Sequence, residues 1–192
     1  MKRIVLLISF IVAVALCSGA QTLIDFHQMP IAGTPTVMPD YFPEGMNLYW
    51  DNFLYVTPGI WSGAGAGFWV DPSTRHNTVA FFGGPLCTLA VPCSASIKLN
   101  PIVLAPLNKT FTPVNITLSA GWYANNVTVL AYNNGKFVGS LRWALTTTPQ
   151  AFTFPAAWTV TQLVFTPDVI NANSVNPNAG SVVIYTFTLM TN

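Results

Sequence analysis

Three carboxylates stand close together in one stretch of the chain, at Asp40, Glu44 and Asp51. A glycosidase needs two carboxyl groups across a cleft, one to protonate the leaving oxygen and one to attack or to activate water. Glu44 is the only glutamate, and the segment around it contains Pro and Gly, which is typical of a loop. Solvation of a loop is therefore the favoured interpretation, and a small glycoside hydrolase is the least favoured function.

The two histidines, His27 and His76, offer little further chemistry. A serine nucleophile needs a histidine base and an elbow turn, and no Gly-x-Ser-x-Gly motif occurs. A zinc site needs a third ligand nearby. The acidic residues that could contribute to a calcium site have no spacing that shows convergence: Asp25, Asp51, Asp71 and Asp168. We expect no catalysis, no cofactor and no metal site.

Tryptophan is the one hint of binding, with six in 192 residues. Aromatic faces can stack on sugar rings, and an exposed ring has an apolar body with a polar edge. Trp61 and Trp69 flank the glycine-rich segment 63–67 and are the two we expect at the surface as ligand-stacking residues. Core packing is the favoured alternative for both. Three others lie in predicted strands: Trp122, Trp143 and Trp158.

The first twenty residues have the pattern of a secretory signal peptide. Lys2 and Arg3 precede residues 4–16, which are apolar except for Ser9, and small residues end the segment at Ala20. A membrane-spanning helix would need about 20 apolar residues. We expect cleavage before Gln21, one domain over 21–192, an extracellular location and no integral membrane anchor.

Two further features fit an exported chain. Cys87 and Cys93 are the only cysteines after residue 20, and we predict a disulfide between them, with two buried free thiols as the alternative. Three sequons, at Asn108, Asn115 and Asn126, allow N-glycosylation in a eukaryotic source, although chance explains a similar number.

The balance of charged residues argues against nucleic acids and anionic membranes as partners. Without Lys2 and Arg3, the other five of the seven cationic residues face six acidic ones. This composition has no basic patch, so nucleic acid is not an expected partner, and nothing predicts attraction to anionic membranes. So few charges also give little repulsion between copies, which favours a structural or adhesive surface protein as an alternative function.

The elements that would position these residues are predicted to be strands. The clearest is a hairpin of 127–132 and 136–143 around Asn134-Gly135, because Asn-Gly suits a primed two-residue turn. Residues 115–122 alternate, with Ile116, Leu118, Ala120 and Trp122 on the inner face and Asn115, Thr117 and Ser119 on the outer face. Further strands are predicted over 22–26, 48–56, 158–165 and 182–190, and a loop over 171–180. The fold class is all-β, an antiparallel two-sheet sandwich or jelly roll.

A family resemblance rests on three segments: 24–26 (Ile-Asp-Phe), 46–53 (Met-Asn-Leu-Tyr-Trp-Asp-Asn-Phe), and 116–165 with its Asn134-Gly135 turn. The chain resembles the β-sandwich domain of PEP-CTERM-type bacterial exoproteins and related fungal secreted proteins. It has no Pro-Glu-Pro tail, and His27 and Gln28 stand where the resembling domains carry acidic residues. The resemblance implies a fold rather than an activity.

These observations favour a secreted, non-catalytic binding module whose partner is a polysaccharide, a cell-surface glycan or other extracellular material. The sequence predicts no oligomeric state.

Overall fold

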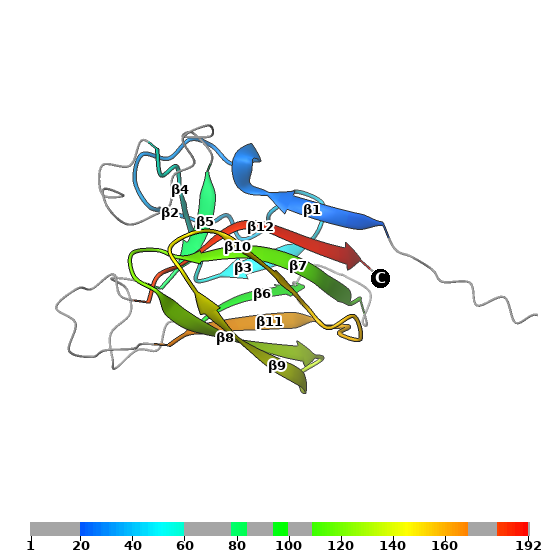
Figure 1. The fold of residues 1–192 in the computed structure, drawn as a ribbon. Helices are drawn as coiled ribbons and strands as arrows, with labels where there is room; N and C mark the ends of the chain where they lie inside the picture. The colour runs from blue at the N-terminus through cyan, green and yellow to red at the C-terminus, as the bar shows by residue number, and fades with distance from the viewer. Residues whose placement is uncertain (1–19, 60–77, 84–93, 100–108, 169–179, 192) are drawn as a thin grey trace, which may run out of the picture.

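Two antiparallel sheets pack face to face in the computed structural model, which describes residues 20–59, 78–83, 94–99, 109–168 and 180–191 (Figure 1). The seven-stranded sheet has the order β10-β7-β12-β5-β4-β2, and β1 also pairs with β12. The five-stranded sheet has the order β3-β6-β11-β8-β9. The predicted all-β sandwich is therefore confirmed.

The longest strands are β7, β8, β9 and β12, all in the second half of the chain. In chain order the strands are β1 (Gln21–Asp25), β2 (Thr36–Val37), β3 (Leu48–Asp51), β4 (Leu54–Val56), β5 (Val79–Phe82), β6 (Ala95–Leu99), β7 (Phe111–Ala120), β8 (Asn125–Asn133), β9 (Lys136–Leu145), β10 (Gln150–Thr153), β11 (Gln162–Pro167) and β12 (Val182–Thr191). A short 3-10 helix, η1 (Phe26–Gln28), follows β1. No helix in these described ranges is long and apolar enough to cross a membrane.

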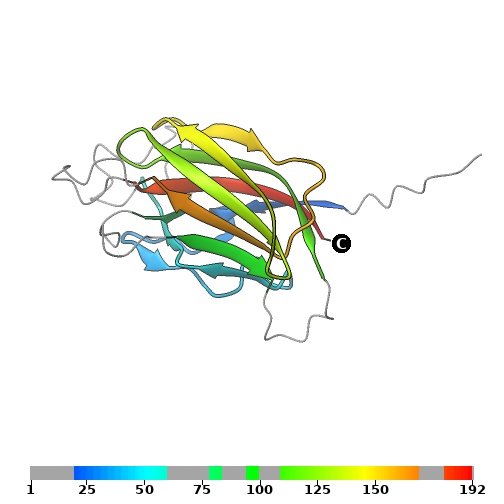
Figure 2. The ribbon, with the colours of Figure 1, turned by 90° about the horizontal axis from the view of Figure 1, so that it is seen from below.

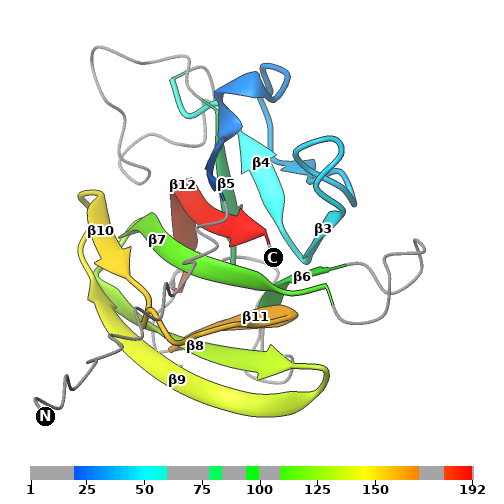
Figure 3. The same cartoon turned by 90° about the vertical axis from the view of Figure 1, so that its right-hand side faces the viewer.

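Aromatic rings fill much of the space between the sheets. Trp50 meets Phe26 edge-on at 5.4 Å and Phe53 at 5.1 Å between ring centroids, and all three are buried. The indole Nε1 of Trp50 donates to the carbonyl of Phe42 at 2.6 Å, so its polar edge is satisfied inside the core. Figure 3 shows the two layers, with β7 and β12 in one and β8, β9 and β11 in the other.

The predicted hairpin is confirmed. β8 and β9 pair from Asn125 with Leu145 to Asn133 with Lys136. Asn134 and Gly135 have φ of 48° and 77°, the left-handed values that a primed turn requires. A register shift after Ala131 is a β-bulge that increases the local twist of the hairpin.

The single strand predicted over 48–56 is wrong, because the chain changes sheets in the middle of it. β3 pairs with β6 in the five-stranded sheet, whereas β4 pairs with β5 in the seven-stranded sheet. Between them Asn52 adopts φ of 63°, a left-handed conformation that Asn tolerates better than most residues other than glycine. Its Nδ2 donates to the Ser94 carbonyl at 3.1 Å and holds the crossing in place.

In the strand predicted over 115–122, the alternation is confirmed from Ile116 to Ala120, but Trp122, predicted on the inner face, packs on the opposite one. Ile116, Leu118 and Ala120 are fully buried. Ser119, predicted on the outer face, is also fully buried, and β7 ends before Trp122. The reason is a second apolar cluster on the opposite face of the seven-stranded sheet, formed by Val56, Val79, Phe81 and Val183, against which Leu54, Trp122 and Tyr185 pack.

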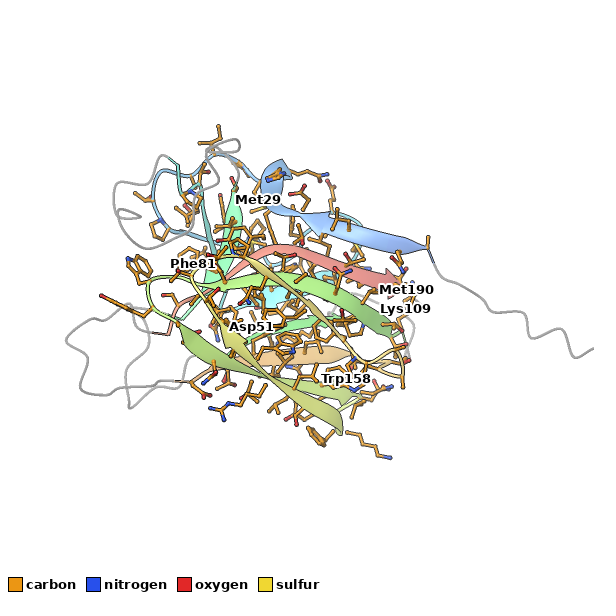
Figure 4. All side chains as sticks on the ribbon, viewed as in Figure 1. Met29, Asp51, Phe81, Lys109, Trp158 and Met190 are labelled. Atoms are coloured by element: carbon orange, nitrogen blue, oxygen red, sulfur yellow. The ribbon has the colours of Figure 1, made fainter. Side chains whose placement is uncertain are left out.

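The strand predicted over 158–165 begins four residues later, at Gln162. Trp158 instead follows a turn, in which its backbone N–H donates to the carbonyl of Pro155 at 3.0 Å. Its side chain is still buried, as core packing predicts. Figure 4 shows side chains filling the space between the sheets, with Phe81 and Met190 at opposite ends of the molecule.

Candidate binding face

The outer face of the five-stranded sheet carries a row of side chains that runs across its strands. We define the outer row as Tyr132 of β8, Gln162 of β11, Lys98 of β6 and Tyr49 of β3. Each is the register partner of the next, from Tyr132 to Gln162, from Gln162 to Lys98 and from Lys98 to Tyr49. Figure 2 shows these strands side by side, with β11 in orange and β6 in green.

Strand alternation sets the direction of the row. All four members are half-buried, whereas adjacent residues in the same strands lie in the core: Ala131, Leu163, Ile97 and Trp50. Successive side chains of a strand point to opposite faces, so the outer row points away from the core. Neighbouring strands lie about 4.8 Å apart, which puts the two ends of the row roughly 14 Å from each other.

The two ends of the row differ in chemistry. At one end Tyr132 contacts Phe137 of β9 edge-on at 5.9 Å, and Phe137 is 55% exposed. At the other end Lys98 Nζ lies 4.8 Å from the centre of the Tyr49 ring, and Tyr41 tilts against the same ring at 6.0 Å. The open aromatic surface is therefore the Tyr132–Phe137 end, while the Tyr49 end presents the Lys98 ammonium.

A middle row lies beside the outer row. Ser140, Leu130, Val164, Ser96 and Asp51 are successive register partners across all five strands of the sheet. Leu130 and Val164 give it an apolar centre. The Ser96 side chain is 6% exposed, and its Oγ makes no hydrogen bond among the described residues.

A polar row completes the face. Arg142 pairs in register with Thr128, and Thr128 with Thr166, whose Oγ1 lies 2.9 Å from Ser94 Oγ. Arg142 also forms an ion pair with Asp168. The face therefore combines aromatic rings, a narrow apolar stripe and a polar border.

Charges on this face occur in opposite pairs. Lys98 Nζ lies 3.4 Å from Asp51 Oδ2, and Arg142 contacts Asp168, which also accepts from Asn126 Nδ2 at 3.4 Å. Lys136, next along β9, alternates with Phe137 and so is directed away from the row. Each exposed pair contributes little to folding. Their consequence is that the charges of the described residues in these three rows and of Asp168 balance.

The hairpin that carries the aromatic end is fixed by hydrogen bonds. Thr161 N–H donates to the Tyr132 carbonyl at 2.8 Å, and Thr161 Oγ1 accepts from Asn134 N–H at 2.9 Å. Asn133 Nδ2 donates to the Thr159 carbonyl at 3.1 Å. The turn is thereby tied to the segment before β11, and the backbone of Tyr132 is held in place.

The carboxylates weighed as a hydrolase pair do not gather around a common cleft. Asp40 and Glu44 are exposed, and Asp51 pairs with Lys98. Asp25 holds His27 instead, with Oδ1 accepting from the His27 backbone N–H and Oδ2 lying 2.9 Å from Nδ1. Among the described residues, no three of His, Cys, Asp or Glu group together as metal ligands would.

Several predicted site residues lie outside the described ranges: Trp61, Trp69, Cys87, Cys93, Asn108, His76 and Asp71. The same holds for residues 1–19 of the predicted signal peptide and for most of the loop predicted over 171–180. Asn115 is half-buried on the seven-stranded sheet, and Asn126 is half-buried with its amide bonded to Asp168. The sequons therefore stay predictions.

Sequence reasoning missed the outer row altogether. The alternation of β8 and β11 places Tyr132 and Gln162 on a polar face, but alternation carries no information about which strands are neighbours. Lys98 and Tyr49 belong to strands that are far from β8 in sequence. Only the strand order and register bring these residues into line.

The fold is shared with solved structures of low sequence similarity. No sequence-family model matches the chain, and no curated protein matches it. A DUF4465 family protein from Bacteroides caccae matches with a TM-score of 0.59 at 11% identity, over 90% of this chain and 100% of that chain. A DUF4465 family protein from Bacteroides ovatus matches with a TM-score of 0.52 at 10% identity, over 91% of this chain and 100% of that chain. The carbohydrate-binding module CBM29-2, in a mutant form, matches with a TM-score of 0.43 at 9% identity, over 90% of this chain and 91% of that chain. These matches show the fold alone.

Proposed function

We propose that this chain is a secreted, non-catalytic module that binds a carbohydrate polymer on the outer face of its five-stranded sheet. The observation that carries the proposal is the outer row together with Phe137, which place an aromatic pair and hydrogen-bonding side chains in line across the sheet. A sugar has apolar C–H faces and a rim of hydroxyls. The rings of Tyr132 and Phe137 suit the apolar C–H faces, and the side chains of Gln162 and Lys98 suit the hydroxyls.

Binding without catalysis is the better-supported reading of this face. Asp51, its only carboxylate in the middle and outer rows, is engaged by Lys98 at 3.4 Å. Hydrolysis would need a second carboxyl group across the scissile bond. The cleaved signal peptide of residues 1–20, the single domain over 21–192 and the Cys87–Cys93 disulfide belong to the same proposal, as does kinship with the PEP-CTERM-type exoproteins. An extracellular location is where such a polymer would be met.

Retention on insoluble and soluble polysaccharides tests the proposal. We expect the protein to be retained by at least one polymer of a panel, and a Tyr132→Ala, Phe137→Ala double variant to lose that retention. Leu23→Ala is the matched control, because Leu23 is an apolar residue of the other sheet that is 59% exposed. No retention on any polymer, or equal retention by the double variant, would exclude this face as a carbohydrate site.

A self-associating surface protein is the second candidate. It is favoured by β9, the ten-residue edge strand of the five-stranded sheet, on which Phe137 and Val138 are 55% and 38% exposed. Such an edge presents unpaired backbone groups that a second strand can join. Light scattering over a range of concentrations separates the candidates: a strict monomer that is retained by a polymer argues against self-association.

A further inference from the structure

The charge pattern of the proposed binding face narrows the class of its ligand. Both cations that the described part of the chain places in the rows of this face have a carboxylate partner, Lys98 with Asp51 and Arg142 with Asp168. An anionic polymer would have to displace a carboxylate that is already in place. From this we infer that the ligand is an uncharged polysaccharide chain that lies across the strands, from the Tyr132–Phe137 end to Lys98. The inference rests on the proposed function.

Lys98 is held so that it serves as a donor to a neutral group. Asp51 fixes the ammonium at 3.4 Å on one side, and the Tyr49 ring lies 4.8 Å from it on another. The side chain is 30% exposed, so part of the ammonium faces solvent. With its charge balanced by Asp51, the ammonium can donate to a sugar hydroxyl without a preference for carboxylates or sulfates.

The direction of the ligand follows from the two ends of the row. The open aromatic surface belongs to β8 and β9, and the donors belong to β11 and β6, so they are separated across the sheet rather than along one strand. A single sugar unit can occupy only one end of a row that is roughly 14 Å long. We therefore expect affinity to rise with oligosaccharide length until the chain spans the row, and then to level off.

The first experiment compares ligand classes for the full chain at two salt concentrations. The neutral probes are galactomannan and mixed-linkage β-glucan, and the acidic probes are polygalacturonate and alginate. Salt at 0.01 M and 1 M changes the screening length from about 30 Å to about 3 Å. We expect a neutral probe to bind with a dissociation constant that differs by less than about twofold between the two conditions, and Tyr132→Ala to weaken it about tenfold, the equivalent of one lost stacking contact.

The second experiment creates the unbalanced charge that the wild type lacks. Asp51→Asn leaves Lys98 without its carboxylate, so this variant is expected to gain retention on polygalacturonate at low salt and to lose it at high salt. Asp25→Asn is the matched control, because it makes the same change in net charge on the other sheet. The inference fails if Asp51→Asn gains nothing, or if Asp25→Asn gains as much.

The outcomes separate this inference from the proposed function. Binding of wild type to acidic polymers alone, released by salt and lost in Tyr132→Ala, would overturn the neutral ligand and leave the binding face in place. Binding of a monosaccharide as tightly as a long oligosaccharide would overturn the orientation across the strands. No binding of either class would remove the proposed function and the inference together.

Discussion

Gly139 lies directly against the Trp158 ring. A Cβ built on Gly139 would be 3.0 Å from Trp158 Cζ2 and 3.1 Å from Nε1, inside ordinary van der Waals contact. Trp158 is buried, and its ring also packs against Phe154 at 6.0 Å. The absence of a side chain at position 139 therefore lets the indole pack against the inner face of the β8–β9 hairpin.

Gly139→Ala is expected to destabilise the protein by about 1–3 kcal/mol, because overpacking a fixed ring forces a shift of the ring or the strand. Urea unfolding measures the loss, and Ser140→Ala, at an exposed neighbouring position, is the control. Trp158→Phe replaces the indole by a smaller ring, so it should lower the free energy of unfolding less in the Gly139→Ala background than in the wild type. Additive losses would show that the two residues do not press on each other.

The hydrogen bond between Ser119 and Tyr185 is expected to contribute to stability. The two hydroxyl oxygens lie 3.0 Å apart, and Ser119 is fully buried. Tyr185→Phe leaves the serine hydroxyl without this partner, which we expect to cost about 1–3 kcal/mol. The double variant Ser119→Ala, Tyr185→Phe should lose less than the sum of the single variants. A double-mutant cycle by chemical unfolding that gives no coupling would contradict the bond.

Because of Tyr185, the free energy of unfolding should also decrease at alkaline pH. Burial raises the pKa of Tyr185 to about 12, against the opposing effect of the hydrogen bond with Ser119. The unfolded tyrosine has a pKa of about 10. Between these values the folded state holds the proton and the unfolded state releases it, so stability is fully present below pH 10 and falls as pH rises toward 12. Tyrosinate absorbance should show a late titration step that Tyr185→Phe removes; its persistence in that variant would assign the step elsewhere.

Local signals in the sequence predicted the hairpin correctly and failed where the decisive contacts are distant. Asn134-Gly135 specifies its turn through backbone conformations that those two residues adopt readily. Asp51 and Asn52 interrupt the alternation of apolar residues, but no local signal shows that the chain passes there from one sheet to the other. Alternation with Leu118 correctly places Ser119 on the outer face, but the cluster that buries it there comes from β4, β5 and β12.

The candidate site was beyond sequence reasoning for a related reason. The sequence drew attention to tryptophans, yet Trp50 and Trp158 are core residues. The exposed aromatic end is built from Tyr132 and Phe137, which are ordinary strand residues by composition. Their alignment with Lys98 depends on a strand order that is not the chain order.

The Cys87–Cys93 disulfide stays a prediction from the sequence. A bridge over so short a loop contributes about 2 kcal/mol in the chain-entropy model. Mass spectrometry of the protein, alkylated with and without prior reduction, should show two cysteines that react only after reduction. Alkylation of both before reduction would mean that the bridge does not form.

Both the backbone conformation of Gly83 and the atoms around it require glycine at this position. Its φ is +81°, and a Cβ there would lie 2.5 Å from the carbonyl oxygen of Gly180, where β5 ends opposite the start of β12. Gly135 is the matched control, with φ of +77° and nothing within 4 Å of a built Cβ. Alanine at either position costs about 1–2 kcal/mol for the left-handed backbone. Gly83→Ala adds a collision with a backbone atom that no side-chain rotation relieves, so its free energy of unfolding should fall by clearly more than that of Gly135→Ala. Equal losses in urea unfolding would mean that the ends of β5 and β12 do not meet as closely as this contact requires.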